Sequence, residues 1–415
     1  MESGETDERI ERALAAVGRT AALEESRKRG ARADALAVAA ALRRELPPEL
    51  ARRAAELLHL RERARDRFPS GKLRFLTRKG LEQATRESVA SERARRFAEL
   101  APGALVHDSA CGLGSDALAL SLAGMRVLAS DWDFETARCA RANLAASPNP
   151  HCVFVADARN SPLIDGLLLI DPDRRKHAGG ETGDRSLDPR DWSPSADELA
   201  PLLARSSGAC VRLPAGFDIE RCPIRWIEGR AHSWQWVSAE GELSEVNLWL
   251  GTLASARAEE REVVSIPREG PVRRWCARPC SVVSLTPEEV SEISWLADPD
   301  PAVVRSGLLE ALAAELGMAP VAPQCGYLGG REAPRSDLVS AWRVLAQCSA
   351  DPKAVRRLLT EHGVGPVQVL KRGHPERAEV LARQFAGRGE RRGVVLVARL
   401  DRGHRAFLVE RGTAG

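Results

Sequence analysis

Residues 106–124 read VHDSACGLGSDALALSLAG. A short apolar lead-in ends at Asp108, Gly112 and Gly114 follow one residue apart, and a run rich in alanine and leucine comes next. An apolar run, a glycine turn and a helix-forming run in this order predict a strand, a tight turn and a helix.

The residues after this stretch alternate in the same way as far as residue 253. Alternating strands and helices predict a parallel sheet, so we expect an α/β domain. Residues 232–253 differ, because they predict a terminal antiparallel hairpin with Gly241 in its turn. The apolar runs that predict the five parallel strands are residues 104–110, 126–133, 152–159, 165–173 and 208–216.

The sequence on either side of this α/β region has other patterns. Residues 7–67 predict helices that Pro47 and Pro48 interrupt, and residues 86–98 predict one more helix. The C-terminal part mixes helical and strand patterns: helices at 301–317, 337–348, 351–363 and 376–387, and strands at 262–267, 280–285, 367–373, 393–400 and 404–410. We therefore expect four segments, at residues 1–97, 98–257, 258–320 and 321–415.

Charge is spread unevenly over the 415 residues, whose net charge is +3. Residues 1–97 carry a net charge of +7, residues 98–320 carry −12, and residues 321–415 carry +8. Basic flanks of this kind favour a polyanionic partner such as nucleic acid. The alternative is a charged face that is merely solvated.

The sequence also bears on the location of the protein and on membrane and metal partners. The N-terminus has no apolar segment of the kind that directs secretion, and no run approaches the length of a membrane span, so we expect a cytoplasmic protein without a membrane partner. The nine cysteines are scattered, and Cys276 and Cys280, the closest pair, have no second pair of ligands. We therefore expect reduced thiols and no metal.

Acidic residues stand at the ends of four successive predicted strands: Asp108, Asp131, Asp157 and Asp171. Because the carboxyl ends of parallel strands share one edge of a sheet, these side chains are expected to line the ligand-binding edge. Asp131 can accept hydrogen bonds from two ribose hydroxyls, Asp157 can accept one from an adenine amino group, and Trp132 can stack on the adenine. One such aspartate is often only a helix cap, but four in register favour a nucleoside site.

The glycine turn fits more than one ligand. Gly112, Gly114 and Ala117, with Asp131 about 20 residues further on, satisfy a loose dinucleotide fingerprint, so an NADP-dependent oxidoreductase remains an alternative. A second alternative is that the turn binds no ligand and serves only tight packing, because glycine is widely used for that purpose. Asp108 argues against a dinucleotide, because a carboxylate there would face a diphosphate, whereas it suits a sulfonium and an amino group.

The stretch LLLIDPDRRK, residues 167–176, completes a resemblance to the class I S-adenosylmethionine-dependent methyltransferases. Residues 108–116 resemble the first motif of that family, residues 156–159 its adenine-contacting segment, and Asp171-Pro172 the start of its fourth motif. The resemblance implies a Rossmann-like core that uses S-adenosyl-L-methionine. The residues that it places at the cofactor, together with the strand-end acids, are Gln83, Thr85, Asp108, Ala110, Gly112, Gly114, Asp116, Asp131, Trp132, Asp157 and Ala158.

The chain also resembles a bacterial group of these enzymes that carries a C-terminal domain described as THUMP-like. Residues 80–98, the loop after Asp171, the hairpin and the block 321–415 carry this resemblance, which makes residues 258–320 the small ferredoxin-like module of that group. True THUMP domains bind RNA, mostly tRNA, so the resemblance implies an RNA partner, tRNA or rRNA. The basic residues that we predict to contact RNA are Arg175, Arg356, Arg357, Lys371 and Arg372.

The fourth motif suggests the chemistry. Enzymes that methylate an amino group of a base usually have Asp or Asn, two prolines and an aromatic residue here, so that the acid and a proline carbonyl hold the amine and the aromatic ring stacks on the base. Asp171 and Pro172 keep the first two groups, whereas Asp173 and Arg174 replace the others. We expect methylation of an RNA base, most simply at a nitrogen, with Asp171, Pro172 and Arg174 catalytic. Trp192 is a second possible stacking platform or a core residue.

Several residues have competing interpretations. Thr85, with Gln83, resembles the segment that folds over the cofactor in cap-guanosine methyltransferases, but it also suits an N-cap for the helix at 86–98. Methylation at a pyrimidine carbon would need a cysteine nucleophile, and Cys111 and Cys210 are better interpreted as core residues. His107 is interpreted as a packed strand residue. For the whole chain, a non-catalytic RNA-binding scaffold with a degenerate cofactor site remains an alternative.

Overall fold

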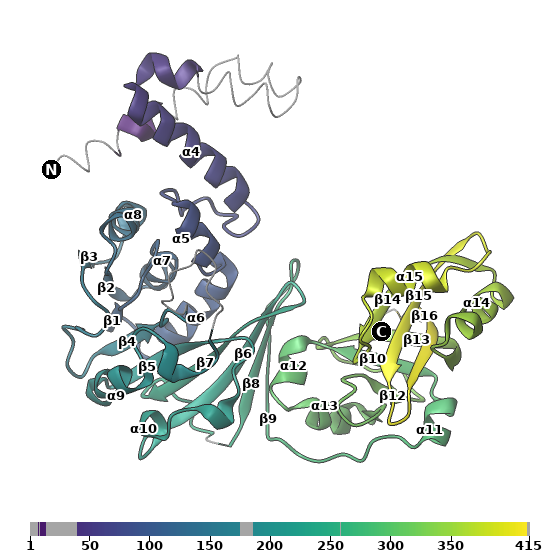
Figure 1. Cartoon of the computed structure of the whole chain (residues 1–415). Coiled ribbons are helices and arrows are strands. Elements are labelled where there is room, and N and C mark those ends of the chain that lie inside the picture. The colour runs from purple at the N-terminus through teal and green to yellow at the C-terminus, as the bar shows by residue number, and fades with distance from the viewer. Residues whose placement is uncertain (1–6, 8, 14–39, 175–185, 258, 413–415) are drawn as a thin grey trace. The chain divides into compact units, whose positions relative to one another are not determined.

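The computed structural model describes residue 7 and residues 9–13, 40–174, 186–257 and 259–412. These residues form two compact units, which are described separately (Figure 1). The first comprises Met1–His232 with Leu248–Ala256, and the second comprises Ser233–Asn247 with Arg257–Gly415. The division into four segments, at residues 1–97, 98–257, 258–320 and 321–415, stays a prediction.

The first unit is built on five parallel strands in the order β3-β2-β1-β4-β5. Four of them lie inside a stretch that the sequence predicts as a strand, and β3 begins one residue before its predicted stretch. A run of apolar residues covered on both faces favours a parallel sheet. β4 shows this most clearly, since all four of its residues are buried. The strands are β1 (Leu105–Asp108), β2 (Arg126–Asp131), β3 (His151–Val155), β4 (Leu167–Ile170) and β5 (Gly208–Pro214).

Helices precede the strands of this sheet and alternate with them (Figure 1). Of these helices, α5 (Arg78–Gln83) and α10 (Ile224–Ile227) are not predicted from the sequence. Pro47 is the N-cap of the first long one, so the predicted break between helices is confirmed. A serine at position 195 and Glu198 form a capping box at another, which explains where that helix begins. The helices are α4 (Pro48–Ala64), α5 (Arg78–Gln83), α6 (Glu87–Leu100), α7 (Ser115–Leu122), α8 (Phe134–Leu144), α9 (Ala196–Arg205) and α10 (Ile224–Ile227), with 3-10 turns at Pro189–Asp191 and Ile219–Arg221.

The predicted hairpin is formed by β6 (His232–Ala239) and β7 (Glu242–Gly251), and Gly241 has the positive φ of 82° that its turn requires. In the second unit, β8 (Arg261–Ile266) pairs parallel to β6, and β9 (Arg273–Ala277) pairs antiparallel to β8. The strand expected at residues 280–285 is wrong, because residues 278–286 have no regular structure. The apolar run there is short, and the strand that this part of the chain forms, β9, lies earlier.

The second unit also contains a seven-stranded sheet in the order β11-β12-β10-β13-β16-β15-β14. Two apolar clusters cover its faces, one including Tyr327 and Phe407 and the other including Leu359 and Phe385. The strands are β10 (Trp295–Pro299), β11 (Ala319–Pro320), β12 (Leu328–Gly330), β13 (Val339–Ser349), β14 (Val364–Arg372), β15 (Arg391–Arg399) and β16 (His404–Arg411), and the helices are α11 (Pro287–Glu292), α12 (Pro301–Arg305), α13 (Leu309–Leu316), α14 (Pro352–Glu361) and α15 (Ala378–Phe385).

Two sequence-based predictions in this unit are corrected. Residues 337–348 are predicted to form a helix, but they form most of β13, which pairs with β10 on one side and β16 on the other. Their alanine, leucine and arginine content favours a helix locally, and pairing on both edges overrides that preference. The expected helix at 301–317 is two helices, because Gly307 adopts a φ of 71° between them.

Across the described parts of the chain, no helix has the length and apolar character that crossing a membrane requires. The same residues contain no group of three or more His, Cys, Asp or Glu side chains placed to hold a metal ion. All nine cysteines have free thiols.

Candidate active site

The four predicted acids lie along one edge of the parallel sheet. Asp108 and Asp131 are the last residues of β1 and β2, Asp171 directly follows β4, and Asp157 comes two residues after β3. Because the neighbouring strands pair in parallel, their carboxyl ends coincide at this edge.

The glycine turn follows β1 at this edge and leads into α7. Gly112 and Gly114 have positive φ angles of 55° and 78°, which other residues rarely adopt. At Gly114 a Cβ atom would also lie 2.9 Å from the Leu144 side chain, which would have to shift to admit it. The turn brings the backbone N–H of Gly112 to Asp131, which accepts its hydrogen bond through Oδ2 at 3.0 Å.

The Asp131 carboxylate is held in place by the backbone. Its Oδ1 accepts a hydrogen bond from the N–H of Asp133 at 3.0 Å, while Oδ2 accepts the one from Gly112. Burial raises the pKa of Asp131. Each carboxylate oxygen has a further lone pair, so the group can still accept two hydroxyl donors, as a ribose requires.

Asp108 is the most unusual residue of the site. Its side chain is buried at 3% exposure, and Oδ2 has no hydrogen-bond partner. Burial raises its pKa well above the usual range, as do the charges of Asp116, Asp171 and Asp131, whereas Arg93 opposes the shift. A buried carboxylate without a partner is costly, and a cationic ligand would satisfy it. This chemistry fits the amino group and sulfonium of S-adenosylmethionine.

A buried ion pair stands beside Asp108. Arg93 of α6, whose side chain is 1% exposed, bonds to Asp116 at the start of α7. The Thr85 hydroxyl donates to the other carboxylate oxygen of Asp116 at 2.6 Å. Thr85 is therefore not the N-cap of α6, because Arg86 occupies that position. Arg93 is not among the residues predicted from sequence, which offers no motif signal for it.

The segment before the core packs directly on the glycine turn. The Ser115 hydroxyl donates to the carbonyl of Thr85 at 2.8 Å. The side chain of Asn143 donates to the carbonyls of Phe75 and Leu113, both at 2.9 Å, and thereby links the two segments. The turn is thus braced by residues 75–85, and residues 80–85 of this segment belong to the stretch 80–98 that carries part of the resemblance. Gln83, in contrast, is exposed at the end of α5.

The residues expected at the adenine lie at the outer part of the edge. Trp132 directly follows Asp131 and is 72% exposed, which is unusual for so large an apolar side chain. Asp157 Oδ1 accepts hydrogen bonds from the N–H and Nε of Arg159, at 2.9 and 3.0 Å. Its other oxygen has no hydrogen bond among the described residues. Ala110 and Ala158 are half-buried at the same edge.

Asp171 meets a partner that the sequence did not indicate. Its Oδ2 accepts a hydrogen bond from Nη1 of Arg212, in β5, at 2.5 Å. Pro172 is buried and Arg174 is half-buried. Asp173 exchanges backbone hydrogen bonds with Ser193, both at 2.8 Å. Arg175, one of the predicted RNA contacts, lies outside the described residues.

The structure decides between the interpretations of four other residues. Trp192 is 3% exposed and packs against Phe217 and Trp226, so it is a core residue and not a stacking platform. Cys111 and Cys210 are buried, as expected of core residues. His107 is fully buried between the hydroxyls of Ser130 and Ser161, and burial lowers its pKa to about 4. These groups are therefore packed rather than positioned for catalysis.

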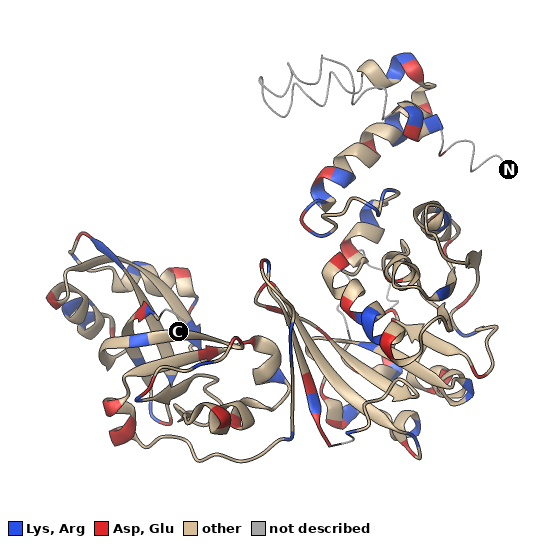
Figure 2. Ribbon diagram, turned by 180° about the vertical axis from the view of Figure 1, so that it is seen from behind, with Lys and Arg blue, Asp and Glu red and all other residues tan. Residues whose placement is uncertain are grey.

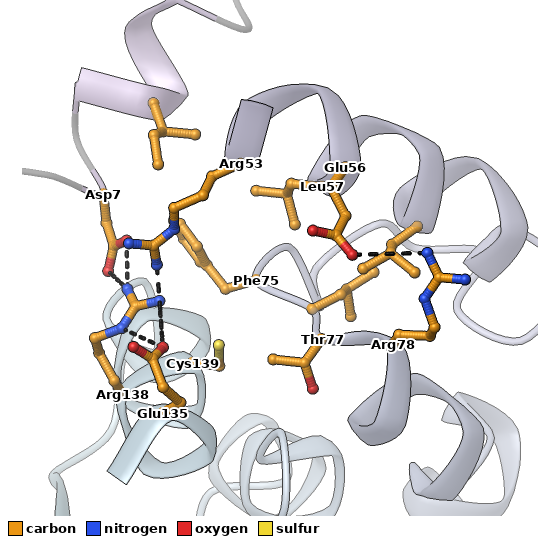
Figure 3. A pocket seen from close by; sticks show the side chains of 13 residues that line it. Asp7, Arg53, Glu56, Leu57, Phe75, Thr77, Arg78, Glu135, Arg138 and Cys139 are labelled. Carbon is orange, nitrogen blue, oxygen red and sulfur yellow. Dashed lines mark hydrogen bonds and ion pairs between the residues drawn. The ribbon is translucent and has the colours of Figure 1, made fainter. Parts of the chain in front are cut away.

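A pocket of about 250 Å³ lies elsewhere in the first unit, between α4 and α8 (Figure 3). Its charged groups pair with one another: Asp7 and Glu135 with Arg138, and Glu56 with Arg78. None of the predicted site residues lines it. It is therefore separate from the edge that carries the four acids.

The predicted RNA contacts in the second unit differ in their surroundings. Arg356 and Arg357 are exposed on α14, and Figure 2 shows basic segments along this helix. Lys371 donates to the carbonyl of His374 at 2.8 Å. Arg372 bonds to Asp298 through Nε and Nη2, at 2.8 and 2.6 Å, and lies over the ring of Tyr327, so its guanidinium is engaged in the fold.

The chain is similar in sequence to one domain family and to two bacterial proteins. Residues 339–411 match the family described as THUMP domain-like. Two proteins from strains of Mycobacterium tuberculosis, both described as uncharacterized S-adenosylmethionine-dependent methyltransferases, are 31% identical over 334 residues, which are 79% of this chain and 86% of theirs. The chain belongs to the S-adenosylmethionine-dependent methyltransferases.

The fold of this methyltransferase agrees with that assignment. A protein of Porphyromonas gingivalis W83, titled a "putative methyltransferase", superposes with a TM-score of 0.69 at 19% identity, over 89% of this chain and 92% of its own. The core is the Rossmann-like class I fold expected from sequence, and the THUMP-like domain follows at the C-terminus. The chain is thus a class I methyltransferase and not an oxidoreductase.

Proposed function

We propose that this methyltransferase modifies a base of tRNA or rRNA, and that it transfers the methyl group to a nitrogen. The proposed cofactor site rests on one observation. The Asp108 side chain at the end of β1, beside the glycine turn, is buried, and its Oδ2 has no hydrogen-bond partner. The carboxyl edge is where ligands bind in sheets of this kind. The RNA part of the proposal rests on the THUMP-like domain and on the basic charge of the C-terminal block.

The cofactor would lie across the edge with its cationic end toward Asp108. Asp131 would accept hydrogen bonds from the ribose hydroxyls, Asp157 from the adenine amino group, and Trp132 would cover the adenine ring. Gly112 and Gly114 let the backbone approach the ligand closely, because they have no side chains. S-adenosylmethionine supplies an electrophilic methyl group. The remaining cofactor contacts predicted from sequence, Gln83, Thr85, Ala110, Asp116 and Ala158, stay predictions.

The acceptor would be held by the fourth motif. The Oδ1 atom of Asp171 and the carbonyl of Pro172 can each accept a hydrogen bond from an amino group, which directs its lone pair at the methyl group. A strong base is unnecessary, because the proton can leave after transfer. Arg174 stands where an aromatic residue is common, and its guanidinium plane can stack on a base or hold a phosphate.

RNA would be bound through charge in the second unit. Arg356 and Arg357 are the strongest candidates, because both are exposed on one helix. Lys371 and Arg372 have partners within the fold, so we assign them a smaller share of the binding. Neutralising phosphates releases counterions, and binding should therefore weaken steeply as the salt concentration rises.

The proposal is tested with labelled S-adenosylmethionine and RNA from a strain that lacks the gene. Methyl transfer to the tRNA or rRNA fraction, followed by mass spectrometry of nucleosides, would identify the modified base. Protein and small-molecule fractions from the same strain serve as competing acceptors. Label confined to those fractions would refute an RNA substrate, and RNA binding without any transfer would support the scaffold alternative.

A further inference from the structure

The side chain that holds Asp171 comes from the neighbouring strand. β4 and β5 pair in parallel with Ile170 opposite Val211, so the next residues along, Asp171 and Arg212, are neighbours at the carboxyl edge. The Nη1 atom of Arg212 lies 2.5 Å from Oδ2 of Asp171. The ion pair therefore follows from the register of the two strands, because Asp171 directly follows β4 and Arg212 lies within β5.

Burial of the two partners is unequal. The Arg212 side chain is 15% exposed, whereas that of Asp171 is 32% exposed. The arginine is thus the more enclosed partner, and the acid is the more accessible one. An arginine has a planar, preorganised group, so it can fix the orientation of a carboxylate as well as offset its charge.

Arg212 is important because Asp171 lies among other acidic side chains. Asp108 and Asp131 lie at the same edge, and Asp116 lies nearby in the first turn of α7. Asp171 is one of the charges that raise the pKa of Asp108. Another unpaired carboxylate there would be repelled by its neighbours, because like charges at short range in a partly buried site cost free energy. Arg212 offsets that repulsion and occupies Oδ2, which leaves Oδ1 for the acceptor.

We propose that Arg212 is a positioning residue: it orients the Asp171 carboxylate so that Oδ1 points at the acceptor nitrogen. This inference rests on the proposed role of Asp171 in holding the acceptor. The competing explanation is that the ion pair only stabilises the segment after β4. The two explanations differ in whether the effect of Arg212 on turnover passes through Asp171.

The first measurement needs no acceptor. Crystal structures of the wild-type protein and of the Arg212→Gln and Arg212→Lys variants, each with S-adenosylhomocysteine, would show the Asp171 side chain. We expect it to leave its position in Arg212→Gln and to keep it in Arg212→Lys. An unchanged Asp171 conformer in Arg212→Gln would overturn the proposal, whatever the acceptor is.

The second measurement uses whichever cellular fraction accepts label from the wild-type enzyme. Arg212→Gln should lose on the order of tenfold to a hundredfold in kcat, the range expected for a misplaced catalytic group, with the Kd for S-adenosylhomocysteine unchanged within about twofold. Arg212→Lys should recover part of the loss. In an Asp171→Asn background, Arg212→Gln should cause no further loss, because the partner through which it acts is gone.

The matched control is Arg225→Gln, which breaks an exposed arginine–aspartate pair, Arg225 with Asp197 at 3.0 Å, on α10 and α9. It should leave kcat within about twofold. Additive losses in the double variant would show that Arg212 acts independently of Asp171 and would overturn the proposal. Absence of label in every RNA fraction would instead contradict the proposed function, and the crystal structures would still decide the role of Arg212.

Discussion

Gly80 of α5 lies against Leu113 in the glycine turn so closely that a Cβ atom at Gly80 would stand 2.7 Å from the Leu113 side chain. The φ angle of Gly80 lies outside the positive range that glycine favours, so space and not backbone conformation is the constraint there. The segment before the core is thus packed directly against the glycine turn.

Gly80→Ala should therefore damage both the fold and the site. A methyl group forced against packed side chains typically costs about 1–3 kcal/mol, and the displaced turn should bind S-adenosylhomocysteine more weakly. Denaturant unfolding and calorimetry measure the two effects. Ser88→Ala, at an exposed position of α6, is the control and should change neither. Wild-type stability and affinity in Gly80→Ala would show that the contact is unimportant.

Asp108→Asn should stabilise the protein while it impairs the site. The folded protein raises the pKa of Asp108, so the stability that depends on its protonation is present at low pH and is lost as the pH rises toward the raised value. An amide carries no charge to bury, and at pH 8 the variant should be more stable by about 1–3 kcal/mol. The gain should shrink at pH 5.

The same residue predicts how cofactor binding depends on pH. A cationic ligand favours the ionised form of Asp108, so binding should release a proton and should strengthen as the pH rises. Calorimetry in buffers with different ionisation enthalpies measures the release, which should vanish in Asp108→Asn. Asp66→Asn, at an exposed position, serves as the control. A proton release that persists in Asp108→Asn would assign it to another group.

Asp131→Ala should weaken binding of S-adenosylhomocysteine by roughly 1–3 kcal/mol, the range for lost hydrogen bonds to a charged group. The substitution also removes the acceptor for the N–H groups of Gly112 and Asp133. Asp131→Asn is therefore a useful companion, because it keeps one acceptor oxygen and loses the charge. If calorimetry finds unchanged affinity in both variants, the ribose role assigned to Asp131 is wrong.

Asp171→Ala should keep cofactor affinity and lose methyl transfer, because its carboxylate is proposed to hold the acceptor and not the donor. Circular dichroism and calorimetry establish that the variant folds and binds S-adenosylhomocysteine. Turnover is then measured on the fraction that the wild-type enzyme labels. A folded, cofactor-binding variant with wild-type turnover would leave the catalytic assignment without support.

Replacing Arg356 and Arg357 together with glutamine should weaken RNA binding and reduce its dependence on salt. Each lost phosphate contact lowers the slope of log affinity against log salt by about 1, so the double variant should show a loss of about 1–2. Titrations at several salt concentrations measure the slope. Arg331→Gln, at an exposed position in the same unit, is the control. An unchanged slope in the double variant would show that RNA binds through other residues.

The order of residues along the chain is enough to predict the parallel sheet, the glycine turn and the edge at which four acids lie. Two of these effects are local: an apolar run forms a buried strand, and a glycine is needed where φ is positive. The alternation of strands and helices then predicts parallel pairing, which brings the carboxyl ends of the strands together. The order of strands and helices along the chain is therefore enough to place Asp108, Asp131, Asp157 and Asp171 at one edge.

The residues that support those acids, and the segments that depart from their local preference, follow from contacts between distant parts of the chain. Arg93 and Arg212 reach Asp116 and Asp171 from other elements, at sequence separations that no motif records. Residues 337–348 favour a helix by composition, yet they form most of β13 because β10 and β16 offer hydrogen-bond partners on both sides. Side-chain pairing and strand pairing depend on residues distant in the chain, and local propensity carries no information about them.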